Sequence, residues 1–166
     1  MKMKRIIAVF ITLIILIGCS SVNTNVYQHA LFDVVLPDGF ERVLDAGVLC
    51  FAPHGDPLLS SSITFYMTEL NWYFDRFTDT DYETALRDQC GYEDLTVESV
   101  QPCRIDGYEG RRVACKVAID QGVHDLIIYI IQADQCYIIT LLNRDTDTYV
   151  DAFDSMMKTI RWKGNA

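Results

Sequence analysis

The chain has 166 residues, half of them hydrophobic, and a formal net charge of −9 at pH 7. This length predicts one ordinary domain with a single core. The negative charge argues against any protein that binds through phosphate backbones or anionic lipid headgroups, because both would repel it. Nucleic acid is therefore not an expected partner.

The N-terminal segment has the order of a secretory signal peptide. Its first five residues carry three basic side chains, and an apolar run from Ile6 to Ile17 follows. A membrane-spanning helix needs roughly 20 apolar residues, so this run is too short for one. The run ends in Leu16-Ile17-Gly18-Cys19, which resembles the lipobox of a bacterial lipoprotein. An uncleaved transmembrane anchor is the alternative.

The lipobox resemblance implies a lipid anchor. Residues 1–18 would be removed, and Cys19 would become the N-terminus with a thioether-linked diacylglycerol. Residues 19–30 would then form the lipidated N-terminus and a polar tether. Loss of the three N-terminal cations would change the net charge from −9 to −12. The acyl chains, and not the protein surface, would hold the protein to the membrane.

The next part of the chain predicts strands followed by a helix. Short apolar runs bounded by Pro, Gly and Asp indicate strands at about 31–36, 42–44, 48–52 and 62–68. An aromatic cluster with no clear period follows at 72–77. Thr80 and Glu83 then form a predicted capping box for a helix that ends at Gly91.

The remaining chain predicts a four-stranded meander and a last helix. The strands are expected at about 95–105, 109–119, 124–132 and 136–142, with a turn at Asp106-Gly107. The last helix follows the helical spacing of Tyr149, Phe153, Met156 and Ile160. The expected fold class is α+β, with both helices packed on an antiparallel sheet.

Several of these segments, in this order, resemble the Mog1/PsbP-like fold. They are residues 32–40 (Phe-Asp-Val-Val-Leu-Pro-Asp-Gly-Phe), the mid-chain helix, the turn at 105–107, two apolar strands, and residues 149–160. The resemblance covers residues 31–162 as a single domain and leaves 163–166 as a tail. It implies an α/β/α sandwich with a central antiparallel sheet. The group contains photosystem II extrinsic proteins, a Ran-binding nuclear protein and many bacterial lipoproteins, and it has no shared catalytic residues.

Five cysteines follow Cys19, and disulfides persist outside the cytoplasm. Cys103 and Cys115 are the candidate disulfide, because they lie on the two arms of the predicted hairpin. A three-residue loop centred on Glu109 would place them face to face, whereas a tight Asp-Gly turn would not. The alternative is that both are free, buried thiols that act as small hydrophobic side chains. No Cys/His spacing indicates a zinc site.

The candidate ligand or partner surface consists of Trp72, Tyr73, Phe74 and Phe77. Aromatic residues outside a regular pattern line pockets and interfaces. The alternative is that they cover the open end of a core. Of the four, Trp72 is expected to be the most exposed.

Two groups of charged residues lie on predicted elements: three aspartates on the last helix and two arginines on the strand at about 109–119. Asp147, Asp151 and Asp154 share one face of the last helix. This face is either exposed to solvent or a docking patch for a basic partner. Arg111 and Arg112 should point to opposite faces of a strand.

No catalytic, cofactor or metal motif is present in the sequence. We therefore expect a non-enzymatic binding or accessory module with no cofactor. It would be held at the extracytoplasmic face of the cell membrane by the lipid on Cys19 and would serve an unknown envelope protein. The first alternative is a carrier of a small apolar ligand in the Trp72 region. The second is a hydrolase, which would require His54 or His124 to lie against a serine or carboxylate. The sequence does not define the oligomeric state.

Overall fold

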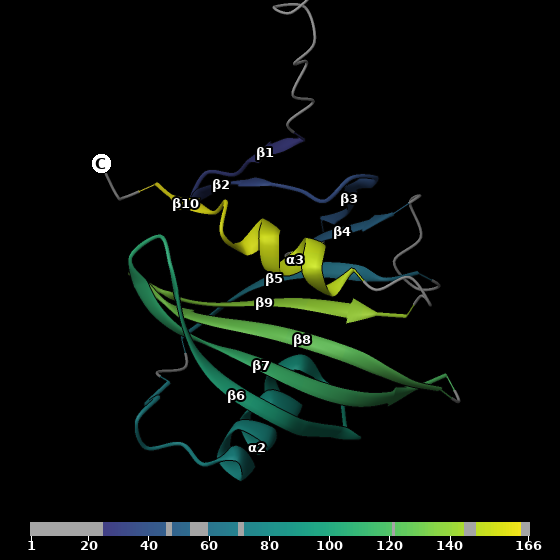
Figure 1. Cartoon of the computed structure of the whole chain (residues 1–166), viewed down its shortest axis with the longest axis vertical. Helices are drawn as coiled ribbons and strands as arrows, with labels where there is room; N and C mark the ends of the chain where they lie inside the picture. The colour runs from purple at the N-terminus through teal and green to yellow at the C-terminus, as the bar shows by residue number, and fades with distance from the viewer. Residues whose placement is uncertain are drawn as a thin grey trace, which may run out of the picture.

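A computed structural model describes residues 25–45, 48–53, 60–69, 72–120, 122–144 and 149–163. The signal segment and Cys19 lie outside the described residues, as do His54 and Asp147. A seven-stranded antiparallel sheet forms the body of the domain (Figure 1). Its strands in spatial order are β3 (Phe40–Asp45), β4 (Leu49–Pro53), β5 (Ser62–Thr68), β9 (Cys136–Asn143), β8 (Gly122–Gln132), β7 (Tyr108–Ile119) and β6 (Leu95–Ile105).

The two faces of this sheet are covered differently. Helix α3 (Val150–Met157) and a small sheet lie over one face, and helix α2 (Asp79–Cys90) lies over the other (Figure 1). The small sheet has the order β1-β2-β10, with β1 at Val26–Gln28, β2 at Phe32–Val35 and β10 at Arg161–Trp162. The prediction of an antiparallel sheet with a mid-chain and a C-terminal helix is confirmed, although strands predominate. Neither described helix is long and apolar enough to span a membrane.

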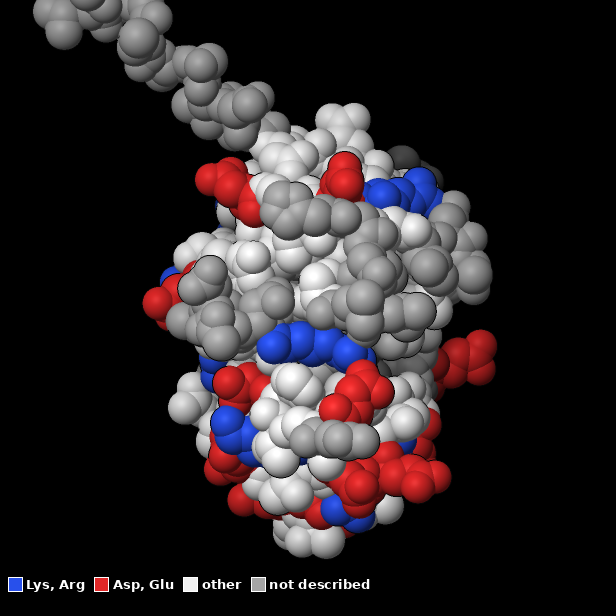
Figure 2. Space-filling model, turned by 90° about the vertical axis from the view of Figure 1, so that its right-hand side faces the viewer, with Lys and Arg blue, Asp and Glu red and all other residues white. Residues whose placement is uncertain are grey.

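The surface at the α2 end is acidic. Figure 2 shows acidic side chains gathered on the lower part of the face it presents, where α2 and the beginning of β6 lie. The acidic residues on α2 and on the connection to β6 are Asp79, Asp81, Glu83, Asp88, Glu93 and Asp94. Much of the net negative charge is therefore concentrated at one end of the domain.

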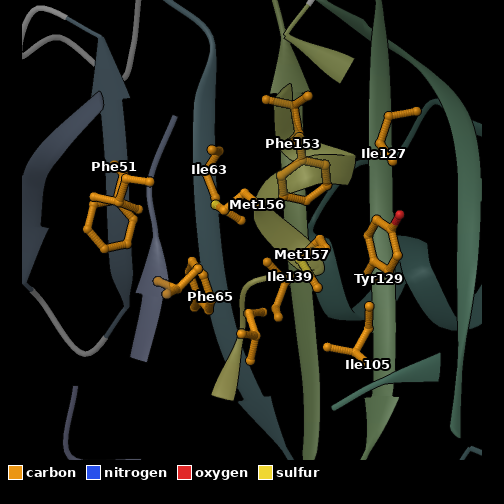
Figure 3. Close-up of a cluster of buried hydrophobic side chains, with 14 of the residues drawn as sticks. Phe51, Ile63, Phe65, Ile105, Ile127, Tyr129, Ile139, Phe153, Met156 and Met157 are labelled. Atoms are coloured by element: carbon orange, nitrogen blue, oxygen red, sulfur yellow. The ribbon is translucent and has the colours of Figure 1, made fainter. Parts of the chain in front are cut away.

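Each face of the large sheet has its own apolar core. The α3-side core joins alternate residues of the strands to α3 and β2, and Figure 3 shows Ile63 and Phe65 of β5 beside Phe153 and Met156 of α3. The α2-side core joins the opposite alternate residues, among them Ile128 and Ile138, to Leu86 of α2. Strands β8 and β9 are buried on both faces, which agrees with the continuous apolar run from Leu126 to Ile131 in β8.

The candidate disulfide between Cys103 and Cys115 is not formed, and this prediction is wrong. Asp106 and Gly107 have φ values of 47° and 89°, and Ile105 pairs directly with Tyr108, so the turn is a two-residue loop. Cys103 therefore lies opposite Gly110, and Cys115 lies opposite Val97. The first packs against the α3-side core and the second against the α2-side core, so the sheet separates the two thiols.

The folded domain begins earlier than predicted. Residues 26–28, which we placed in the tether, form β1 and pair with β2 in antiparallel register. The Tyr27 ring makes an edge contact with Phe51 at 4.8 Å between centroids, and the Asn25 side chain donates a hydrogen bond to the Phe40 carbonyl. These contacts are between segments distant in sequence, so local polarity gave no sign of them.

The capping box of α2 lies two residues before the predicted one. Thr78 is the N-cap, and its side chain accepts from the Asp81 backbone N–H while the Asp81 carboxylate accepts from the Thr78 backbone N–H. The Asp81 carboxylate also accepts from the Thr78 hydroxyl, and the hydrogen bonds that it accepts from the Thr78 backbone and side chain lower the pKa of Asp81. Glu83 instead pairs with Arg87 at 2.6 Å and accepts from the Val97 backbone N–H, which ties α2 to β6. The helix ends at Gly91 as predicted.

Helix α3 is fixed to the sheet by a polar network. Arg112 of β7 donates two hydrogen bonds of 3.0 Å to the two carboxylate oxygens of Asp154, and the Tyr129 hydroxyl donates a third at 2.9 Å. Burial, and after it the Asp154 carboxylate, raises the pKa of Tyr129. Asp154 therefore faces the sheet and does not belong to a solvated face or docking patch with Asp151. Arg111 and Arg112 point to opposite faces of β7, as predicted.

Candidate functional site

Several turns and chain segments lie close together at one end of the large sheet. The β6–β7 turn at Asp106-Gly107, the β8–β9 turn at Ala133–Gln135, and β10 lie together at the left of Figure 1. The Trp162 backbone N–H donates to the Asp106 carboxylate at 2.9 Å, which links β10 to the first turn. We call this region, together with the adjoining segment 72–77, the turn end. The β7–β8 turn lies at the opposite end of the sheet.

Trp72 is a core residue, contrary to the expectation that it would be the most exposed of the four aromatic residues. Only 3% of its surface is exposed. Its ring stacks on Tyr82 of α2 at 5.8 Å and lies 5.6 Å from the Phe77 ring. Backbone hydrogen bonds from Arg76 and Phe77 to the Tyr73 carbonyl close a turn that brings Trp72 and Phe77 to the same side. These two residues cover the end of the α2-side core.

Tyr73 and Phe74 lie nearer the surface. Tyr73 is 54% exposed, and the Arg76 guanidinium lies 5.6 Å from the centre of its ring. Phe74 is half-buried, with the Arg111 guanidinium 4.6 Å from its ring centre. Both contacts have the geometry of a cation–π interaction. The four predicted residues therefore divide into a buried pair and a pair that forms part of a surface.

Arg111 is held in place by two carboxylates. It pairs with Glu109 at 3.0 Å and with Asp75 at 3.5 Å, and its own side chain is largely buried. The stacking on Phe74 and the two ion pairs fix the orientation of the guanidinium. Segment 72–77 is thereby joined to β7.

A hollow of about 440 Å³ lies beside this pair of surface residues. Its lining residues are Trp72, Tyr73, Phe74, Asp75, Arg76, Glu109 and Gln132. We predicted an apolar pocket here, but the hollow contains both charges and a buried amide. The Trp72 Nε1 donor and the Gln132 Oε1 acceptor are buried, and neither has a hydrogen-bond partner among the residues that the structure describes. Such a lining suits a polar contact with another protein better than an apolar ligand.

A second hollow, of about 160 Å³, lies between the small sheet and the large sheet. It includes Tyr27 and His29, which we placed in the tether, and Met67, two positions after Phe65 in β5. Met67 is 58% exposed. Our interpretation of the sequence missed this site because its residues come from strands that are distant in the chain. The one local signal was the aromatic and basic character of residues 27–32 and 42.

The described cysteines after Cys19 are all unpaired, and burial suppresses their ionisation. Burial raises the pKa of Cys90, Cys115 and Cys136 to about 12 and that of Cys103 to about 11. At neutral pH these side chains are thiols and not thiolates, and the thiolate is the nucleophile and metal ligand. Within the described ranges, no three His, Cys, Asp or Glu side chains are grouped so as to hold a metal ion.

No family model matches the sequence, and no curated protein is recognisably similar to it. Solved structures do resemble the fold. The cyanobacterial PsbP protein (CyanoP) of Synechocystis sp. PCC 6803 is 15% identical, with a TM-score of 0.60 over 83% of this chain and 91% of that one. PA94 of Pseudomonas aeruginosa, described as a protein of unknown function and putative regulator, is 15% identical, with a TM-score of 0.55 over 84% and 97%. The domain therefore has a PsbP-like fold, as the sequence resemblance implied. A shared fold at this identity does not carry function.

Proposed function

We propose that the protein is a lipid-anchored, non-enzymatic binding or accessory module at the extracytoplasmic face of a bacterial membrane. The observation that carries the anchor is Leu16-Ile17-Gly18-Cys19 directly after a basic start and a short apolar run. In this proposal the mature chain starts at Cys19, and the few residues before β1 are the tether. We also propose that the domain is an α/β/α sandwich, because one helix lies on each face of the large sheet.

The turn end is the proposed contact surface for a protein partner. The exposed large apolar residues in this region are Tyr73 and Met67, and Arg76 lies over the Tyr73 ring. Tyrosine, methionine and arginine are enriched at protein interfaces, and tyrosine and arginine dominate their binding energy. The unpaired donor of Trp72 and acceptor of Gln132 beside them would both be satisfied by a backbone or side-chain amide of a partner.

The charge of the domain supports a position away from the lipid surface. The acidic α2 end would be repelled by anionic headgroups, so the lipid on Cys19 would tether a body that stays in the aqueous phase. The turn end is then free to meet a second envelope protein. The proposal assigns no reaction to the domain. His124 lies at the beginning of β8, whereas the hollow beside Tyr73 lies at the other end of that strand, where Gln132 lines it.

Photo-crosslinking from Tyr73 tests the contact surface. A benzoylphenylalanine at position 73 of the full-length protein should capture the same envelope protein in repeated experiments on intact cells. Position 123 is the matched control, because Val123 is 70% exposed and lies at the opposite end of the sheet. We expect no specific product from position 123. Identical products from both positions, or no product from position 73, would contradict the proposed surface.

A small-ligand carrier is the second candidate function, but its predicted site has changed. The hollow beside Trp72 is open and lined by the charged residues Asp75, Arg76 and Glu109, whereas the hollow between the two sheets is lined largely by aromatic rings. That second hollow is the observation that favours a ligand.

A further inference from the structure

The point at which the tether joins the domain is fixed by the fold. Asn25 is the first residue that the structure describes, and its side chain donates a hydrogen bond of 3.0 Å to the Phe40 carbonyl. The Asn25 carbonyl accepts a hydrogen bond of 2.9 Å from the Leu36 backbone N–H, and β1 begins at the next residue. The tether of the proposed lipoprotein therefore consists of residues 19–24 and ends at the small sheet.

This tether has a short reach. Fully extended, the chain from Cys19 to Asn25 spans at most about 21 Å, at roughly 3.5 Å per residue. A domain that began at residue 31, as the sequence predicted, would leave a span of about 42 Å. The residues that fold into β1 and the β1–β2 turn thus halve the reach of the lipid anchor.

Helix α2 lies on the far side of the domain from this attachment point. The small sheet and α2 cover opposite faces of the large sheet, and β1 and α2 lie at opposite ends of the domain in Figure 1. Packed layers are about 10 Å apart and a helix with its side chains is about 10 Å thick, so the outer surface of α2 is at least about 25 Å from β1. A compact domain of this size is about 35 Å across. Both lengths exceed the reach of the tether, so α2 cannot rest on the membrane surface while Cys19 is held there.

The charges on the two sides of the domain agree with this arrangement. The strands of the small sheet carry one acidic residue, Asp33, and one basic residue, Arg161, and Asp33 pairs with Lys163 at 2.7 Å. Residues 79–94, by contrast, carry six acidic side chains and one basic side chain. The potential of an anionic membrane falls off within a Debye length of about 8 Å, so the acidic end escapes repulsion when it points away.

We propose that the short tether holds the domain with its small sheet toward the membrane and α2 pointing away from it. The surface that faces the lipid headgroups is then the outer side of β1, β2 and β10. Segment 72–77 packs on the α2-side core, so Tyr73 stays clear of the membrane and accessible to a protein partner. This inference rests on the proposed lipid anchor at Cys19, but it can fail while the anchor stands.

Energy transfer from two labelled positions to the membrane surface tests the orientation. Full-length, lipidated protein is placed in phosphatidylcholine vesicles whose outer leaflet carries an acceptor dye on its headgroups. Azidophenylalanine coupled to a donor dye replaces Arg161 of β10 in one variant and Asp88 of α2 in the other, and both residues are exposed. Transfer should be several-fold greater from position 161, because the two positions lie on layers about 20 Å apart. The neutral lipid leaves the tether as the orienting factor.

The outcomes separate this inference from the anchor on which it rests. Equal transfer from the two positions, or greater transfer from position 88, would overturn the inference and leave the lipid anchor intact. A protein that the vesicles do not retain would contradict the anchor, and the inference with it.

A lengthened tether is the matched control for the cause of the orientation. Insertion of a Gly-Ser segment of about 20 residues between residues 24 and 25 raises the maximum span from Cys19 to Asn25 to about 90 Å. The difference in transfer between positions 161 and 88 should then largely disappear, because every face of the domain can reach the surface. An unchanged difference would show that the tether does not set the orientation and would overturn the proposal.

Discussion

Replacing Trp72 with alanine is expected to lower the free energy of unfolding by about 3 kcal/mol or more. The side chain is 97% buried, because only 3% of its surface is exposed, and it stacks on Tyr82 in the α2-side core. Its removal would leave a cavity that Phe77 and Tyr82 are too constrained to fill. Urea denaturation of the full-length protein, followed by circular dichroism, measures the change.

Tyr73→Ala is the matched control, because this neighbour is 54% exposed. Its free energy of unfolding should stay within about 0.5 kcal/mol of that of the unmodified protein. Equal losses from the two substitutions would contradict the division of the aromatic cluster into a core pair and a surface pair. The comparison separates stability from binding: Trp72 should affect folding, and Tyr73 should affect only partner capture.

Replacing Asp154 with alanine is expected to lower the free energy of unfolding by about 2–4 kcal/mol. The substitution leaves Arg112 without its bidentate partner and the Tyr129 hydroxyl without its acceptor, at a site that is mostly removed from water. The same urea denaturation measures the loss. Asp151→Ala on the same helix should change stability by no more than about 0.5 kcal/mol, because Asp151 is exposed.

A double replacement distinguishes the lost pair from a general defect in α3. Arg112→Met combined with Asp154→Leu removes both charges and fills similar volume, which in buried pairs is often neutral or stabilising. We expect the double variant to be more stable than Asp154→Ala alone. If it is less stable than either single variant, the ion pair does not explain the effect.

The sequence predicted the parts of the fold that local patterns determine. The alternation in β5 and the continuous apolar run in β8 each correspond to a strand, and Phe153 and Met156 occupy the buried face of a helix. Asp106-Gly107 was recognised as a turn. Its length was left open, and that single detail decided whether Cys103 and Cys115 could meet.

Several errors concern which segments pair or pack in the folded chain. Residues 26–28 belong to a segment that is polar as a whole, and they form a strand because β2 offers a partner. Trp72 is buried because a turn places it over Tyr82, which no periodicity in segment 72–77 reveals. Likewise, the hollow between the small sheet and the large sheet joins Tyr27, Arg42 and Tyr137, which have no pattern in common along the chain. Binding sites made between sheets are therefore harder to predict than the sheets themselves.

Intact-mass and N-terminal peptide analysis of the protein purified from bacterial membranes tests the central claim most directly. The account predicts a chain that begins at Cys19 and carries a diacylglycerol on its sulfur. In Cys19→Ala, the same analysis should find no lipid, and the protein should be released or remain as the uncleaved precursor. An unmodified Cys19 in a membrane-bound chain that retains residues 1–18 would contradict the lipid anchor and the proposed role that depends on it.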